Sequence, residues 1–160
     1  MQMARLLDRL KERLSTSGAQ VETGGNGGAP VSAVMAYLAD MRDAERWAAN
    51  ASTGADQVDA DLIKARWREI RAKHCTDRVI AQPLSVAYGD PPRHDPAKTR
   101  VVNVATSRSD RALVETLERF SDRPLMEARY EYRVHLVGGE WRLNSRVRKE
   151  PGEPSISGLL

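Results

Sequence analysis

Apolar residues recur every three or four positions in three segments of the first half of the chain, residues 3–15, 31–51 and 56–74. This spacing places the apolar side chains on one face of an α-helix. The segments therefore predict three amphipathic helices, and the short connection between the second and the third predicts that these two pack antiparallel. The apolar faces consist of Met3, Leu6, Leu7, Leu10 and Leu14, then Val34, Met35, Leu38, Met41 and Trp47, and then Leu62, Ile63, Trp67 and Ile70.

A glycine-rich stretch separates the first predicted helix from the other two. Residues 24–30 read Gly-Gly-Asn-Gly-Gly-Ala-Pro, a composition typical of a flexible linker. We therefore interpret residues 1–30 as an N-terminal amphipathic helix with its linker, and we place the start of the domain at Val31.

Apolar and polar residues alternate in the second half of the chain, which is the pattern of half-buried strands. It predicts strands at residues 99–106, 111–119, 128–137 and 140–148, and Gly138-Gly139 fits a two-residue hairpin turn between the last two. In the strand at 128–137, the alternation places Tyr130 and Tyr132 in the core. In the last strand, it separates Trp141, Leu143, Ser145 and Val147 from a solvent-facing set of Arg142, Asn144, Arg146 and Arg148.

Residues 76–96, between the helices and these strands, are rich in proline, which excludes helix there. They predict an irregular segment with one short strand at residues 84–88. The polar residues 150–160 predict a flexible tail. Helices followed by an antiparallel sheet predict an α+β domain over residues 31–149, with the N-terminal helices packed on a curved sheet.

Net charge, cysteine content and the length of apolar runs argue against several classes of function. The 160 residues carry a net charge of +3, far from the strong positive field of a dedicated nucleic-acid binder. The single cysteine, Cys75, allows no internal disulfide and fits the reducing cytoplasm. No stretch approaches 18 consecutive apolar residues, so no membrane span is predicted.

Two histidine-containing pairs are the first candidates for catalysis. His74 and Cys75 are adjacent in sequence, and neighbours on a helix point about 100° apart, so they do not form a nucleophile–base pair. His94-Asp95 precedes Pro96, a sequence that favours the start of a turn.

The remaining candidates are carboxylates and glycines. Glu115 and Glu118 lie three positions apart on one predicted strand, so their side chains point to opposite faces and cannot act together on one substrate. The glycine run lacks the lysine of a phosphate-binding loop, and one cysteine with three scattered histidines lacks the spacing of a metal site. The sequence therefore predicts no catalytic, cofactor-binding or metal-binding residues.

Charge is unevenly distributed within the domain. Basic residues are concentrated in the last hairpin and acidic residues between positions 40 and 61, an asymmetry that can steer a charged partner but is equally typical of solvated faces. Phosphate binding at the hairpin stays an open alternative. The residues concerned are Arg129, Arg133, Arg142, Arg146, Arg148 and Lys149 on the basic side, and Asp40, Asp43, Glu45, Asp56, Asp59 and Asp61 on the acidic side.

Six short motifs follow one another along the chain. They are Met41…Glu45-Arg46-Trp47, Ile70…His74-Cys75-Thr76, Tyr88-Gly89-Asp90-Pro91-Pro92-Arg93-His94-Asp95-Pro96, Val114-Glu115-Thr116, Tyr130-Glu131-Tyr132 and Gly139-Glu140-Trp141-Arg142-Leu143. Their order and spacing resemble those of the nuclear transport factor 2-like fold immunity proteins of bacterial polymorphic toxin systems. The resemblance covers about residues 33–147, and the N-terminal helix and its linker depart from the family pattern.

This resemblance implies a cone-like fold, related to that of the cystatins, with helices packed in the concave side of a highly curved antiparallel sheet. It also implies a cytoplasmic protein that is not an enzyme and that binds and neutralises a cognate toxin. Two alternatives stay open. The same fold hosts small-molecule-binding domains and enzymes of the isomerase and dehydratase type, which should show a polar pocket where Trp47, Trp67 and Trp141 would otherwise fill the space. The other is a scaffold or adaptor that uses the N-terminal helix.

For a toxin-binding protein, we expect the contacts to lie in the acidic helical segment between residues 40 and 61 and in the proline-rich loop at residues 83–96. The loop is stiffened by proline, so it loses little entropy on binding, and the carboxylates suit a basic toxin surface. Membrane and nucleic acid are not expected partners, no cofactor is expected, and homo-oligomerisation stays open. The predicted partner-binding residues are Asp56, Asp59, Asp61, Tyr88, Arg93 and His94.

Overall fold

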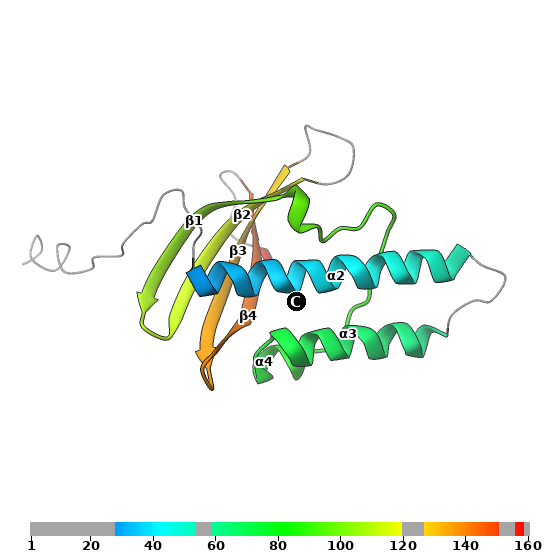
Figure 1. Ribbon diagram of the computed structural model, residues 1–160, viewed down its shortest axis with the longest axis horizontal. Coiled ribbons are helices and arrows are strands. Elements are labelled where there is room, and N and C mark those ends of the chain that lie inside the picture. Colours follow the sequence, from blue (N-terminus) through cyan, green and yellow to red (C-terminus); the bar gives the residue numbers. More distant parts are fainter. Residues whose placement is uncertain (1–27, 54–58, 120–126, 151–155, 159–160) are drawn as a thin grey trace, which may run out of the picture.

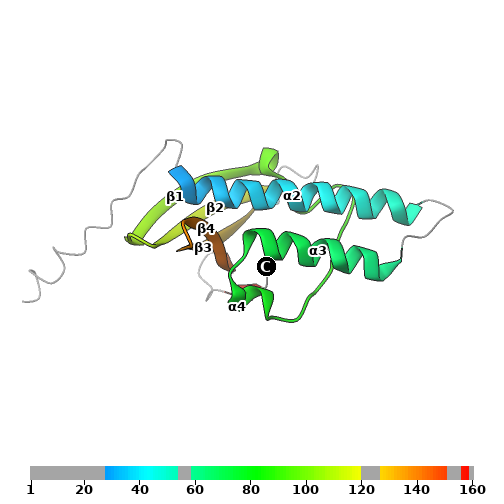
Figure 2. The ribbon, with the colours of Figure 1, turned by 60° about the horizontal axis from the view of Figure 1, so that its bottom comes forward.

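The computed structural model describes residues 28–53, 59–119, 127–150 and 156–158. The predicted N-terminal helix and most of its linker lie outside the described residues. Within them, one long helix crosses one face of a curved antiparallel sheet, and a second helix lies beside it (Figures 1 and 2). The predicted α+β class, with helices first and sheet second, is confirmed.

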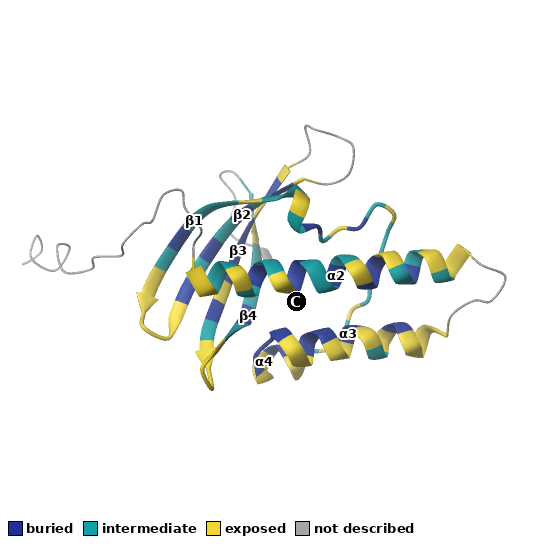
Figure 3. Ribbon diagram, viewed as in Figure 1, coloured by how far each residue is buried: buried dark blue, intermediate teal, exposed yellow. Residues whose placement is uncertain are grey.

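The helical layer consists of α2 (Gly28–Thr53), α3 (Ala60–His74) and the short α4 (Asp77–Ile80). The exclusion of helix from residues 76–96 is therefore wrong at α4, which ends before Pro83, the first proline of that segment. Helix α2 begins three residues earlier than predicted, because Pro30 lies in its first turn, where a helix has no hydrogen bond for the missing N–H. Helix α3 is capped by Asp59, whose carboxylate accepts a hydrogen bond from the backbone N–H of Asp61 at 3.0 Å. Both helices bury most of the apolar face that their periodicity predicts (Figure 3). Leu62, predicted on the buried face of α3, is instead 58% exposed.

The sheet contains five strands in sequential order, each antiparallel to its neighbours. The predicted hairpin turn is confirmed, with positive φ angles of 59° at Gly138 and 83° at Gly139. The predicted strand at 84–88 is wrong, since that segment is irregular and leads into the short 3-10 helix η1 (Pro96–Lys98). The strands are β1 (Thr99–Arg108), β2 (Arg111–Arg119), β3 (Glu127–Val137), β4 (Glu140–Lys149) and β5 (Ile156–Gly158).

One extra residue in β4 changes which side chains face the helices. Leu143 lies opposite Val134 and Ser145 lies opposite Arg133, so Asn144 has no partner and forms a β-bulge. The alternation predicted from sequence holds up to this bulge and is reversed after it. Arg146, predicted to face solvent, therefore lies opposite Tyr132 on the inner face, which we define as the face toward α2.

The free edge of β4 is covered along most of its length. Cys75 forms a parallel bridge with Leu143, and the N–H of Thr76 donates to the carbonyl of Leu143 at 3.0 Å. Farther along, β5 pairs with Arg146–Arg148, so three residues of the predicted flexible tail belong to the sheet. These pairings satisfy backbone groups that would otherwise expose a sheet edge.

The core fills the space between α2, α3 and the inner face of the sheet. Tyr37 and Leu38 of α2 and Trp67 of α3 are buried there, as are Tyr132 and Leu143 of the sheet. The inward orientation predicted for Tyr130 and Tyr132 is confirmed, whereas Trp47 and Trp141 pack on the core but stay partly exposed. None of the described helices is long and apolar enough to cross a membrane.

Replacing Leu143 with alanine should lower the free energy of unfolding by about 2–5 kcal/mol, because its side chain is fully buried and a cavity would remain. Leu136→Ala is the matched control. Leu136 lies on β3 and is 37% exposed, so its loss should cost less than about 1 kcal/mol. Urea unfolding measures both, and equal losses would contradict the described core.

Candidate functional site

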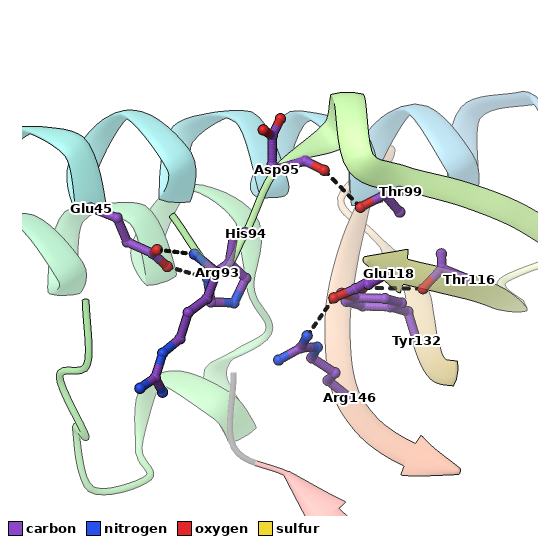
Figure 4. Close-up of polar contacts among 9 residues, drawn as sticks. All are labelled: Glu45, Arg93, His94, Asp95, Thr99, Thr116, Glu118, Tyr132 and Arg146. Atoms are coloured by element: carbon purple, nitrogen blue, oxygen red, sulfur yellow. Dashed lines mark hydrogen bonds and ion pairs between the residues drawn. The ribbon is translucent and has the colours of Figure 1, made fainter. Parts of the chain in front are cut away.

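A cluster of polar side chains is buried on the inner face of the sheet (Figure 4). Its centre is the carboxylate of Glu118 on β2, which is 2% exposed. One carboxylate oxygen accepts hydrogen bonds from the hydroxyls of Tyr132 at 2.5 Å and Thr116 at 3.1 Å. The other accepts a charged hydrogen bond from the guanidinium of Arg146 at 2.6 Å. Every side chain of the cluster therefore binds the same carboxylate.

Strand geometry explains how these residues meet. Thr116 and Glu118 lie two positions apart on β2 and share a face, and Tyr132 projects from the same face of the neighbouring β3. Arg146 reaches this face because of the bulge in β4, and its guanidinium lies over the ring of Tyr130, 3.5 Å from the ring centroid. The stacking and the ion pair together hold the guanidinium in a site shielded from water.

The chemistry of this cluster favours structure over acid–base catalysis. Burial raises the pKa of Tyr132 well above its ordinary value, and the neighbouring Glu118 carboxylate raises it further. The tyrosine hydroxyl therefore stays protonated, and the carboxylate is already engaged by three donors. Among the described residues, Arg146 Nε is buried without a hydrogen-bond partner.

A second buried carboxylate, Glu45 of α2, holds the proline-rich loop (Figure 4). It accepts a hydrogen bond from the backbone N–H of Arg93 at 2.5 Å and another from Nδ1 of His94. The imidazole of His94 also meets the ring of Tyr37 edge-on, with centroids 5.9 Å apart. One carboxylate therefore fixes both the backbone and a side chain of the loop.

Further contacts hold the rest of the loop. Arg71, nearly buried on α3, donates to the carbonyl of Gln82 at 3.1 Å where the loop begins. The hydroxyl of Tyr88 lies 2.8 Å from that of Ser52 on α2. At the other end, Asp95 caps η1 by accepting from the N–H of Ala97 at 3.0 Å. The loop is thus attached to α3 where it begins and to α2 in its middle, and it ends in the capped helix η1.

The structure brings together three of the six predicted partner-binding residues. Tyr88, Arg93 and His94 all lie in the loop against α2, but only the side chain of Arg93 is exposed, since His94 points inward to Glu45. Asp61 is exposed at the start of α3, and Asp59 is committed to capping that helix.

The sixth, Asp56, lies outside the described residues.

The predicted separation of His74 and Cys75 is confirmed. His74 Nε2 lies 2.7 Å from the carboxylate of Asp40, which also binds Lys73 at 2.8 Å, and these bonds hold the pKa of Asp40 below its usual range. Cys75 is buried, which raises its thiol pKa to about 12. A thiol with this pKa stays protonated at neutral pH and is a poor nucleophile.

The two glutamates of β2 point to opposite faces, as predicted. Glu118 lies in the inner cluster, whereas Glu115 binds Lys149 at 3.1 Å on the outer face. In the part of the chain that the structure describes, no group of three or more histidine, cysteine or acidic side chains gathers to hold a metal.

Sequence reasoning missed Glu45 and Glu118 as buried residues, yet both carried a signal. Glu45 continues the spacing of Leu38 and Met41 on the apolar face of its helix, and Glu118 continues the alternation of Val114 and Thr116 on its strand. An acidic residue at a core position of the pattern is a candidate for a buried, paired charge.

Comparison with protein-family models, with curated proteins and with solved structures finds no match to this chain.

We expect Tyr132 to stay protonated until the protein unfolds. Its pKa is raised in the folded state, so its contribution to stability is complete below about pH 10 and is lost as the pH rises above the unfolded-state value. Ultraviolet absorbance of tyrosinate and circular dichroism, followed together, measure this. If all four tyrosines ionise while the circular dichroism stays native, the expectation is wrong. Tyr132→Phe should make the alkaline loss of stability less steep.

Glu118→Gln should lower the free energy of unfolding by about 3–5 kcal/mol, because it leaves the buried guanidinium of Arg146 without its counter-charge. Glu115→Gln is the control on the same strand. Its pair with Lys149 is more exposed, and its loss should cost at most about 1 kcal/mol.

The double variant Glu118→Gln with Arg146→Met should recover much of the loss. Denaturant unfolding of Glu118→Gln, Arg146→Met and the double variant measures the coupling energy between the two side chains. A double variant as unstable as the sum of its parts would show that the two side chains do not act as a pair.

Proposed function

We propose that this protein neutralises a bacterial toxin by direct protein–protein contact and that it is not an enzyme. The observation that carries the proposal is the attachment of the loop at residues 83–96. The buried carboxylate of Glu45 fixes the loop, while the adjacent Arg93 side chain extends into solvent (Figure 4). This is the arrangement of a preformed contact surface.

A fixed loop favours tight binding because little conformational freedom is left to lose on association. Arginine is enriched among the residues that dominate protein interfaces. The exposed side chain of Arg93 is placed to pair with an acidic group of the toxin. Asp61, 83% exposed at the start of α3, offers the opposite charge to a basic one.

The inner cluster supports a binding role over a catalytic one. Enzymes that move protons need a carboxylate or tyrosine with a pKa near the working pH. Here the Glu118 carboxylate binds three donors, and the pKa of Tyr132 is displaced far in the wrong direction.

Contacts between the family motifs support the proposed nuclear transport factor 2-like fold. Glu45 of the first motif binds the His94 motif, and Cys75 of the second pairs with Leu143 of the last. Thr116 and Tyr132, from two further motifs, both bind Glu118. Motifs that contact one another in this way work as one structural set, and helices on a curved antiparallel sheet are compatible with that fold.

The resemblance to this family also implies a location in the cytoplasm of the toxin-producing cell, and we propose that location here. The buried, free Cys75 fits it. A small-molecule-binding function is the second candidate. It is favoured by the unpartnered Nε of Arg146 on the inner face of the sheet.

Co-expression with the toxin encoded by the adjoining gene tests the proposal. Wild-type protein should restore growth and co-purify with the toxin. Arg93→Glu and Asp61→Lys should each weaken binding at least about tenfold, equivalent to about 1.4 kcal/mol. Asp59 is left unchanged because it caps α3.

Arg108→Glu is the matched control, since Arg108 is an exposed arginine at the far end of β1. It should protect like wild type, and circular dichroism should show that all three variants fold. If Arg93→Glu and Asp61→Lys both protect fully, the toxin contacts another surface. If wild-type protein neither binds the toxin nor protects against it, the immunity function is wrong.

A further inference from the structure

A second concave site lies apart from the loop and from the inner cluster. It is a cavity of about 570 Å³ lined by α4, by β1, β2 and β3, and by Asn144 of β4. Four basic side chains line it: Arg78 of α4, Arg111 of β2, and Arg133 and His135 of β3. Its volume falls within the range of small-molecule sites in proteins.

Strand register explains why these side chains converge. Arg111 lies directly opposite His135, and Leu113 lies directly opposite Arg133. Directly opposed residues on an antiparallel pair have neighbouring side chains on one face. This face is the outer one, because the alternating residues Ala112, Val114, Tyr132 and Val134 are buried on the inner face.

The positive charge in the cavity is incompletely balanced. Arg133 forms an ion pair with Glu131 at 3.2 Å, but among the described residues neither Arg78 nor Arg111 has a carboxylate within ion-pair distance. The pKa of His135 is lowered by burial and then by the charges of Arg111, Arg78 and Arg133, and the charge of Asp110 opposes them in part. The imidazole therefore experiences a net positive field.

The positive field arises because the fold holds several arginines close together, and a bound anion would reduce it. Arginines attached to three different elements are held near one another by the fold, and their repulsion falls when an anion lies between them. A phosphate group accepts paired hydrogen bonds from guanidinium groups. Leu113 and Ala105 supply an apolar wall, which suits an organic substituent on the phosphate.

We propose that the outer cavity binds a small phosphorylated organic molecule through Arg78, Arg111 and Arg133, with His135 beside the phosphate. The site is independent of toxin binding, since it shares no residue with the loop at 83–96 or with the start of α3.

Nuclear magnetic resonance of the histidine side chains in the full chain tests this site. The probes are inorganic phosphate and adenosine monophosphate, with adenosine as the uncharged control. Both phosphates should shift the His135 resonance in a saturable way and raise its pKa, because an anion favours the imidazolium form. His74 and His94, bound to Asp40 and Glu45, should not respond. Adenosine monophosphate should bind at least about tenfold more tightly than phosphate, since it also contacts the apolar wall.

Arg111→Gln and Arg78→Gln should each weaken binding of adenosine monophosphate at least about fivefold, the effect of losing a charged hydrogen bond. Arg68→Gln, which alters an exposed arginine of α3 outside the cavity, should leave the affinity unchanged. The proposal is overturned if neither phosphate shifts His135 at about 10 mM, a concentration that reveals even very weak binding. It is equally overturned if adenosine binds as tightly as its monophosphate, or if Arg68→Gln weakens binding as much as the cavity variants do.

Discussion

The ion pair between Glu118 and Arg146 determines how the sheet is built. A carboxylate on the inner face needs a positive partner there, because an unpaired charge among apolar side chains costs several kcal/mol. The partner comes from β4 only because Asn144 is left out of the pairing with β3, which turns Arg146 inward. The bulge and the buried pair therefore depend on each other, and together they join three strands.

Glu45 holds the loop through hydrogen bonds, as Glu118 holds neighbouring strands of the sheet. Both carboxylates lie on core positions of their elements, and each accepts hydrogen bonds from groups in a distant part of the chain. These bonds engage both carboxylates inside the domain. Those of Glu45 also fix the loop backbone at Arg93, whose side chain stays exposed.

Sequence patterns predicted most of the architecture but did not identify Glu45 and Glu118 as buried acids. Strand β2 has the predicted ends and the Gly138-Gly139 turn has the predicted geometry, since both follow from local rules of alternation and backbone freedom. The position of a bulge depends on the pairing with the neighbouring strand. Nothing in the alternation of β4 marks Asn144 as the residue without a partner on β3, so the sequence could not show which face of the sheet Arg146 occupies. The contact of Glu45 with His94 was likewise invisible, because it joins residues far apart in sequence.

The distribution of buried and exposed residues also explains why a resemblance in sequence motifs reports on the fold more than on the surface. The motif residues that carry it, such as Glu45, Cys75 and Tyr132, are buried, and each contacts a residue of another element or loop, so changing any of them disturbs the fold. Arg93 and Asp61 are exposed, and their substitution costs the core nothing. A scaffold divided in this way can retain its motifs while its surface adapts to a new partner. The motifs therefore carry information about the fold, whereas exposed side chains such as Arg93, whose backbone Glu45 holds, and Asp61 can change without disturbing it.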